Sequence, residues 1–203
     1  MALAAARMNP EHREILLRDK PAQMLEISPK GTVPVLLTHG GMVLDESFDI
    51  MLHALETRDP HGWLRNVDCA ERRALLNTND GSFKTALDRY KYASRAGQDL
   101  VAAALDEAAI MLQRIEGAMA GAPFIDGRSM GLFDAAISPF VRQLAGVDRA
   151  RFEAIAPPAV LAWLQTMVES AAFKNVMAKV PLWRAGDDPR MFAGTLAAHA
   201  PSP

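Results

Sequence analysis

The sequence predicts a small α/β unit of about 60 residues followed by an all-helical unit. Strand and hairpin signals are confined to the first part of the chain. From Asp68 onward, apolar residues recur every three or four positions, as on one face of a helix. Strands grouped before helices favour two units over one doubly wound sheet. The expected bounds are 1–58 for the α/β unit, 65–188 for the helical unit and 189–203 for a loose tail.

The α/β unit opens with an alanine-rich helix over residues 1–7, which Asn9-Pro10 ends. Residues 12–17 (HREILL) alternate enough to predict a short strand. Residues 21–27 (PAQMLEI) predict a turn or two of helix, with proline at the first helical position.

A hairpin and a helix complete this unit. The β-branched run at 33–37 predicts a strand, and His39-Gly40-Gly41 predicts a tight turn into a return strand at 42–44. Ser47 is placed to cap a helix that runs to Thr57. The apolar face of that helix consists of Phe48, Met51, Leu52 and Leu55.

The second half of the chain carries the helical period in four stretches. A long helix is expected over 69–95, interrupted at Asn79-Asp80-Gly81, and further helices over 98–120, over 132–145 and from Pro157-Pro158 onward. The clearest apolar stripe contains Val101, Leu105, Ala108, Leu112, Ile115 and Met119.

The composition excludes several classes of function. With 50% hydrophobic and 23% charged residues and a net charge of -2, the 203-residue chain gives no electrostatic reason to expect a nucleic-acid or anionic-membrane partner. The single cysteine, Cys69, argues against a disulfide-stapled secreted fold. The histidines are scattered, so no metal site is predicted. No apolar run approaches the roughly 20 residues of a membrane helix, and a cytoplasmic location is expected.

Val33-Pro34 is the first candidate for ligand binding. A cis X-Pro bond at the start of a strand would turn the backbone N–H and C=O of Val33 outward, toward an extended ligand. The alternative is an ordinary trans proline at a strand start. Only about 5–6% of X-Pro bonds in folded proteins are cis, so the residues alone favour the trans form.

Glu46-Ser47 and Lys30 are the other candidates. At a helix N-terminus Ser47 favours a carboxylate, and Glu46 beside it suits an ammonium group, so the pair fits an α-amino-acid head group. Lys30, in a Pro-Lys-Gly turn, suits the second carboxylate of a short peptide. The alternatives are a plain helix cap and a solvated surface lysine.

Three further features receive mainly structural interpretations. Gly131 with Asp134 predicts a helix-capping device. Tyr90 either belongs to a solvated basic face or lines a substrate pocket, and Cys69 is interpreted as an ordinary cysteine near a helix start.

Together these motifs resemble the cytosolic glutathione transferase family over most of the chain. Residues 28–36 (SPKGTVPVL) resemble the family's loop and cis-proline strand, and residues 44–47 (LDES) resemble its Glu/Gln-Ser pair. Gly131 to Asp134 corresponds to its Ser/Thr-x-x-Asp capping box, here with glycine as the cap. Residues 173–183 are similar to its last helices.

The resemblance implies a thioredoxin-like N-terminal domain, an all-helical C-terminal domain, glutathione as co-substrate, no metal, and a homodimer. It places the cysteinyl part of glutathione on the backbone of Val33 beside Pro34, the γ-glutamyl head on Glu46 and Ser47, and the glycyl carboxylate near Lys30. The second substrate would be a small hydrophobic electrophile or a disulfide. Its cleft would include Tyr90, and the activity would serve detoxification.

The chain departs from the family at its start. Family members open with a strand, a loop bearing a catalytic Cys, Ser or Tyr, and a full first helix, whereas this chain begins inside that helix. About 15–20 residues are absent by this comparison. The N-terminal domain is therefore expected to be truncated, and the catalytic residue is expected upstream of Met1. Something is expected to fill the strand gap beside 12–17 and 33–37, or the domain is disordered.

Two hypotheses follow. The first is a glutathione transferase that conjugates glutathione to an electrophile or exchanges it with a disulfide. The second is a non-catalytic binding or scaffold protein with the same fold.

Overall fold

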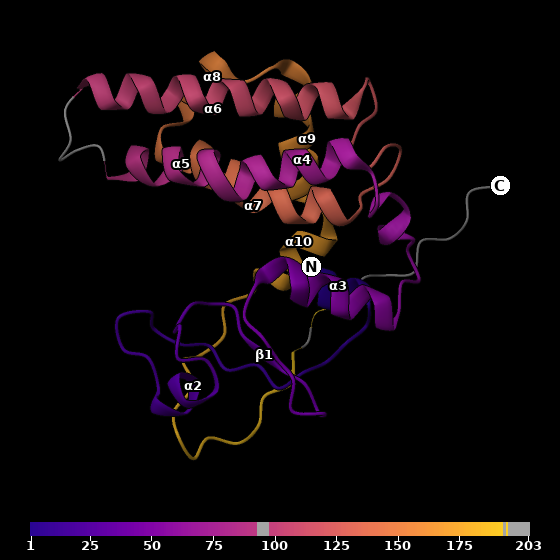
Figure 1. Cartoon of the computed structure of the whole chain (residues 1–203), viewed down its shortest axis with the longest axis vertical. Helices are drawn as coiled ribbons and strands as arrows, with labels where there is room; N and C mark the ends of the chain where they lie inside the picture. The colour runs from indigo at the N-terminus through magenta and orange to yellow at the C-terminus, as the bar shows by residue number, and fades with distance from the viewer. Residues whose placement is uncertain (93–97, 193, 195–203) are drawn as a thin grey trace. The chain divides into compact units, whose positions relative to one another are not determined.

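The computed structural model describes residues 1–92, 98–192 and 194 (Figure 1). The chain divides into two compact units, Met1–His61 with Ala171–Pro203, and Gly62–Ser170. By their contacts, the residues from Ala171 onward group with the N-terminal segment rather than with the helices before them. The domain bounds at 58, 65 and 188 stay a prediction about which parts fold independently.

The first unit is built around one helix and a hairpin. Its elements are α1 (Ala2–Ala5), α2 (Ala22–Ile27), β1 (Leu36–Leu37), β2 (Val43–Leu44), α3 (Ser47–Thr57) and α10 (Ala171–Val176). The hairpin is antiparallel, with Leu36 opposite Leu44 and Leu37 opposite Val43, as the glycine turn predicts. Helix α1 packs on α3, and small alanines let the two helices approach closely. The buried residues of the two helices are Ala2, Ala4, Ala5, Ile50, Ala54 and Leu55.

The strand predicted over residues 12–17 is wrong. The chain turns within the segment, where the Asp19 N–H donates to the Leu16 C=O at 3.0 Å, and this turn stops a continuous ladder. Two isolated bridges touch this region: Leu16 pairs with Asp19 across the turn, and Glu11, just before the segment, pairs with Met191. The backbone of this region therefore pairs with the C-terminal end of the chain.

The C-terminal end also differs from the expectation. Helix α10 ends at Val176, so residues 177–183 are not helical although the resemblance implies helices as far as Trp183. The tail, expected to be loose, is hydrogen-bonded at residues 190–192 to the N-terminal segment. Residues 193 and 195–203 lie outside the described part of the chain.

The second unit is a bundle of helices. Its elements are η1 (Trp63–Asn66, a 3₁₀ turn), α4 (Ala70–Thr78), η2 (Asn79–Phe83, a π-helical turn), α5 (Lys84–Lys91), α6 (Gln98–Met119), α7 (Leu132–Val147), α8 (Arg149–Ile155) and α9 (Pro158–Glu169). The predicted interruption at 79–81 is therefore confirmed as a π-helical turn between α4 and α5. Figure 1 shows α6 running beside α4 and α5, which it contacts.

The predicted apolar stripe of α6 faces the bundle core. Ala108, Leu112, Ile115 and Met119 are all buried, whereas Val101 and Leu105 near the start of the helix are half-buried. Phe133, Ile137 and Leu144 of helix α7 are buried as well. None of the helices in the described residues is both long and apolar enough to cross a bilayer.

A buried carboxylate organises the start of α7. Asp134 is fully buried and accepts four hydrogen bonds, from the N–H groups of Ile125 (2.8 Å), Asp126 (3.2 Å) and Gly131 (3.0 Å) and from the Trp163 indole (2.8 Å). Burial, and then the charge of Asp126, raise the pKa of Asp134 to about 6, while these donors act in the opposite direction. The predicted capping role of Asp134 is confirmed.

Asp126 supplies the part of the cap that Gly131 lacks. A capping box normally uses a Ser or Thr hydroxyl at the cap position, and glycine has no side chain. Here the Asp126 Oδ2 accepts from the Phe133 N–H at 2.8 Å, in the first turn of α7. A Cβ on Gly131 would lie 2.4 Å from that same oxygen. The carboxylate of Asp126 therefore occupies the space that a cap side chain would need.

This arrangement predicts that restoring the usual cap residue is harmful. Gly131→Ser should lower the free energy of unfolding by about 1–3 kcal/mol, because the new side chain overlaps Asp126. In an Asp126→Ala background the same substitution should be neutral or stabilising by about 1 kcal/mol, since the hydroxyl then caps α7. Denaturant titration of the four chains measures both effects.

Gly146→Ser on the same helix is the matched control, because a Cβ at Gly146 meets no atom within 4 Å. If Gly131→Ser is tolerated as well as Gly146→Ser in the parent chain, Asp126 does not hold this position.

Candidate functional site

A tight turn presents Lys30. The Gly31 N–H donates to the Ser28 C=O at 2.9 Å, and Gly31 has a φ of +62°, a conformation that favours glycine. A Cβ on Gly31 would also lie 3.2 Å from the Leu25 side chain of α2. The sequence Pro29-Lys30-Gly31 therefore forms the predicted turn and leaves the lysine side chain exposed.

Val33 is an exposed residue beside a proline. The Val33-Pro34 peptide bond is cis, and the expectation drawn from the resemblance is confirmed. The Val33 side chain is 45% exposed. Within the described part of the chain, no residue bonds the N–H or the C=O of Val33. This backbone can therefore pair with an extended ligand, as an unpaired strand edge does.

The start of α3 follows directly on the hairpin, because β2 ends at Leu44 and α3 begins at Ser47. The expected cap is corrected by one residue: Glu46 occupies the cap position and Ser47 is the first helical residue. The reason is that the Glu46 C=O already accepts from the Ile50 N–H at 3.1 Å, which closes the first turn.

Lys30 and Glu46 meet across this region. Lys30 Nζ forms a hydrogen-bonded ion pair with Glu46 Oε1, and Asp45 Oδ2 lies 3.8 Å from the same nitrogen. The hydrogen bond to Glu46 raises the pKa of Lys30, and the charge of Asp45 adds to this rise. Sequence reasoning missed Asp45, although its place directly before Glu46-Ser47 was the available signal. Lys30 and Glu46, which were expected to bind opposite ends of a peptide, therefore bind each other.

Residues 28–47, which we call the peptide cradle, combine four kinds of group. They offer an unbonded extended backbone at Val33, helix-start amides that favour an anion, a carboxylate at Glu46 and an ammonium at Lys30. This set suits a short peptide with charged ends.

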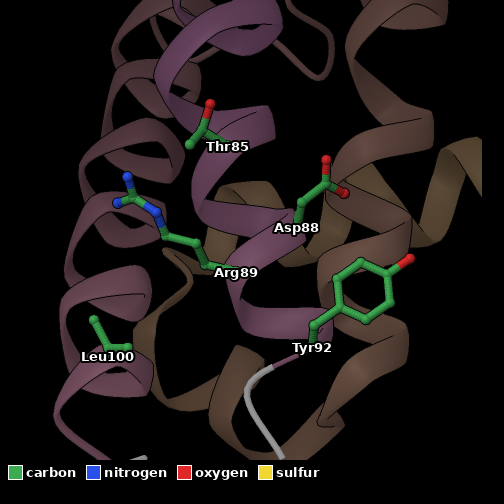
Figure 2. A pocket seen from close by; sticks show the side chains of 5 residues that line it. All are labelled: Thr85, Asp88, Arg89, Tyr92 and Leu100. Carbon is green, nitrogen blue, oxygen red and sulfur yellow. The ribbon is translucent and has the colours of Figure 1, made fainter. Parts of the chain in front are cut away.

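Tyr90 lies in the second unit and is 6% exposed. Burial raises the pKa of its phenol, and the charge of Asp148 adds to this rise. A hollow of about 420 Å³ on the same helix is lined instead by Thr85, Asp88, Arg89, Tyr92 and Leu100 (Figure 2). In Figure 2, Thr85, Asp88 and Arg89 project from α5, Tyr92 from just after its end and Leu100 from α6. The role of Tyr90 in a second-substrate pocket stays a prediction.

Cys69 and possible metal ligands give no further site. Cys69 occupies the cap position of α4, where its sulfur lies 3.0 Å from Arg72 Nη1 and 3.1 Å from a Glu71 carboxylate oxygen. The Arg72 guanidinium also contacts the loop before α7, where its Nε donates to the Ile125 C=O at 2.9 Å. In the described residues, no three His, Cys, Asp or Glu side chains are grouped to hold a metal ion.

Comparison with known proteins gives one family match and many structural matches. Residues 1–57 match the family described as glutathione S-transferase, N-terminal domain. No curated protein sequence matches the chain.

Three solved structures illustrate the structural likeness. The Tau class glutathione S-transferase from mango, Mangifera indica, is 25% identical with a TM-score of 0.71, and the match covers 88% of this chain and 85% of that one. Glutathione transferase Omega 3C from Trametes versicolor is 19% identical with a TM-score of 0.73, covering 89% and 83%. A Sulfitobacter homologue solved with bound glutathione is 20% identical with a TM-score of 0.60, covering 77% of each chain. The predicted fold class, a thioredoxin-like domain followed by an all-helical domain, is confirmed.

The exposure of the Lys30–Glu46 pair predicts that it contributes little to stability. Lys30→Ala and Glu46→Gln should each leave the midpoint of urea denaturation unchanged within error, because exposed ion pairs are screened by solvent. Any loss of ligand binding by these variants then reflects the site. A marked fall in the midpoint would show instead that the pair holds the turn at Gly31 in place.

Proposed function

We propose that the chain is a member of the glutathione S-transferase family, since residues 1–57 match its N-terminal domain, and that the peptide cradle binds glutathione. The observation that carries this proposal is that the Lys30–Glu46 ion pair joins the turn before the Val33-Pro34 peptide to the start of α3, on either side of one hairpin. Glutathione is an extended tripeptide with a zwitterionic head at one end and a carboxylate at the other, and the four groups of the cradle match it.

Each residue receives one role in binding. The N–H and C=O of Val33, beside Pro34, pair with the cysteinyl residue as a neighbouring strand would. Ser47 and the first turn of α3 receive the γ-glutamyl carboxylate, and Glu46 takes its ammonium group. Lys30 leaves Glu46 and receives the glycyl carboxylate. Binding therefore exchanges one exposed ion pair for two contacts with the peptide.

The reaction we propose is transfer of glutathione to a small hydrophobic electrophile, or its exchange with a disulfide. In either case the thiol of glutathione is the nucleophile, and the residues of the cradle hold it in place. We assign no residue to the activation of that thiol. We further propose a homodimer acting in the cytoplasm, with Phe48 and Met51 on the face of α3 that meets the partner.

The second candidate is a binding or scaffold protein of the same fold. It is favoured by one property of the cradle: its groups recognise a peptide, and none of them activates a thiol. Both candidates predict glutathione binding, and only the first predicts turnover.

Calorimetry with glutathione and its two dipeptide fragments tests the assignments. Glu46→Gln should weaken glutathione and γ-glutamylcysteine about tenfold and leave cysteinylglycine unchanged, because the last lacks the head group. Lys30→Ala should weaken glutathione about tenfold and leave γ-glutamylcysteine unchanged, because it lacks the glycyl carboxylate. Glu56→Gln, at the far end of α3, is the matched control and should bind all three ligands like the parent chain.

Two results would contradict the proposal. Binding of glutathione that neither Glu46→Gln nor Lys30→Ala weakens would place the ligand elsewhere. The absence of any binding at millimolar glutathione would remove the function. Binding without turnover of an aryl halide or a mixed disulfide would select the binding protein over the enzyme.

A further inference from the structure

The C-terminal segment 181–192, which we call the C-terminal strap, pairs with the N-terminal segment 10–14 inside the first unit. The Phe192 N–H donates to the Pro10 C=O at 2.8 Å, and the His12 N–H donates to the Arg190 C=O at 2.6 Å. Glu11 and Met191 therefore face each other as an antiparallel pair. These two short bonds on either side of one residue pair are the pattern of a strand docked on an edge.

The strap makes a second contact after a small loop. The Trp183 N–H donates to the Glu14 C=O at 2.8 Å. Between the two contacts the strap turns back on itself, because the Asp187 N–H donates to the Arg184 C=O at 3.0 Å and Gly186 takes a φ of +95°. The strap has more residues between its two contacts (183 to 190) than the edge has (14 to 12), and this loop accommodates the extra residues.

Aromatic side chains clamp both ends of the contact. The Arg13 guanidinium lies 4.6 Å from the centre of the Trp183 ring, a cation–π geometry. The guanidinium is held by two hydrogen bonds to Glu11, at 2.8 and 3.1 Å. At the other end the rings of His12 and Phe192 meet edge to face, with their centres 6.2 Å apart. Backbone bonds and side-chain pockets together resemble the recognition of a peptide by strand addition.

An open strand edge is a hazard, since it offers unpaired N–H and C=O groups to strands of other molecules. We propose that residues 10–14 are a strand-docking edge and that the C-terminal strap is its resident ligand, which closes the edge to other chains. The edge recognises an extended peptide that carries one aromatic ring for Arg13 and another for His12.

Disulfide trapping in the full chain tests the placement. Glu11→Cys with Met191→Cys, in a Cys69→Ser background, joins a pair that lacks direct hydrogen bonds, where side chains are closest. We expect an intrachain disulfide under mild oxidation, seen as faster migration on a non-reducing gel and as a linked peptide by mass spectrometry. Leu17→Cys with Met191→Cys is the matched control, because Leu17 lies outside the paired segment and is exposed. It should form the bond far more slowly.

A peptide in trans tests the recognition. In the full chain, Trp183→Ala with Phe192→Ala removes both clamps and loosens the strap. A labelled synthetic peptide of residues 180–192 should bind this variant and show little binding to the parent chain, as measured by fluorescence anisotropy. The same peptide carrying both alanine substitutions should bind at least tenfold more weakly.

Three outcomes would overturn the proposal. The first is a disulfide at 11/191 that forms no faster than the control pair. The second is a disulfide that joins two chains in place of one. The third is equal binding of the peptide to the parent chain and to the variant, since the resident strap should compete with it.

Discussion

The first unit depends on the register of a very short hairpin. Pairing Leu36 with Leu44 fixes where every residue on either side must lie, because a slip of one position would turn each side chain to the opposite face. Near this hairpin Lys30 meets Glu46 over 16 positions of sequence. Gly31 in the turn and Gly41 in the hairpin loop make the path possible, since few other residues accept their positive φ angles. The recognition groups of the cradle are a consequence of this geometry.

The second unit depends on a different constraint, a pair of buried carboxylates. Asp134 gathers four N–H donors around the start of α7, and Asp126 supplies the cap oxygen that Gly131 lacks. The two charges lie close together in the interior, so Arg72 at 3.3 Å from Asp126 offsets part of their repulsion. Glycine at the cap and aspartate in the preceding loop therefore form one device. The role of Gly131 at the cap depends on Asp126, and Asp126 can act as the cap because Gly131 leaves the space free.

The sequence predicted the features that depend on local chemistry. The glycine hairpin, the interruption at 79–81 and the apolar stripe of α6 follow from neighbouring residues, and the start of α3 was predicted to within one residue. The cis bond at Pro34 needed the family resemblance, because no local rule distinguishes it from trans. The features that the sequence did not predict involve partners distant in sequence. Residues 10–14 pair with residues 183–192 in place of the strand predicted over 12–17, and Lys30 forms an ion pair with Glu46. Periodicity says which face of a segment is buried and says nothing of which segment it meets.

We propose that the hairpin and the start of α3 form the recognition part of a glutathione site. Nuclear magnetic resonance titration of the ¹⁵N-labelled chain with glutathione measures this directly, residue by residue. We expect saturable shifts of the Val33 amide and of the first-turn amides of α3, with smaller changes at Gly31 and none in the core of α7. Shifts confined to the helical unit, or no shifts at the Val33 and Ser47 amides at saturating glutathione, would contradict it.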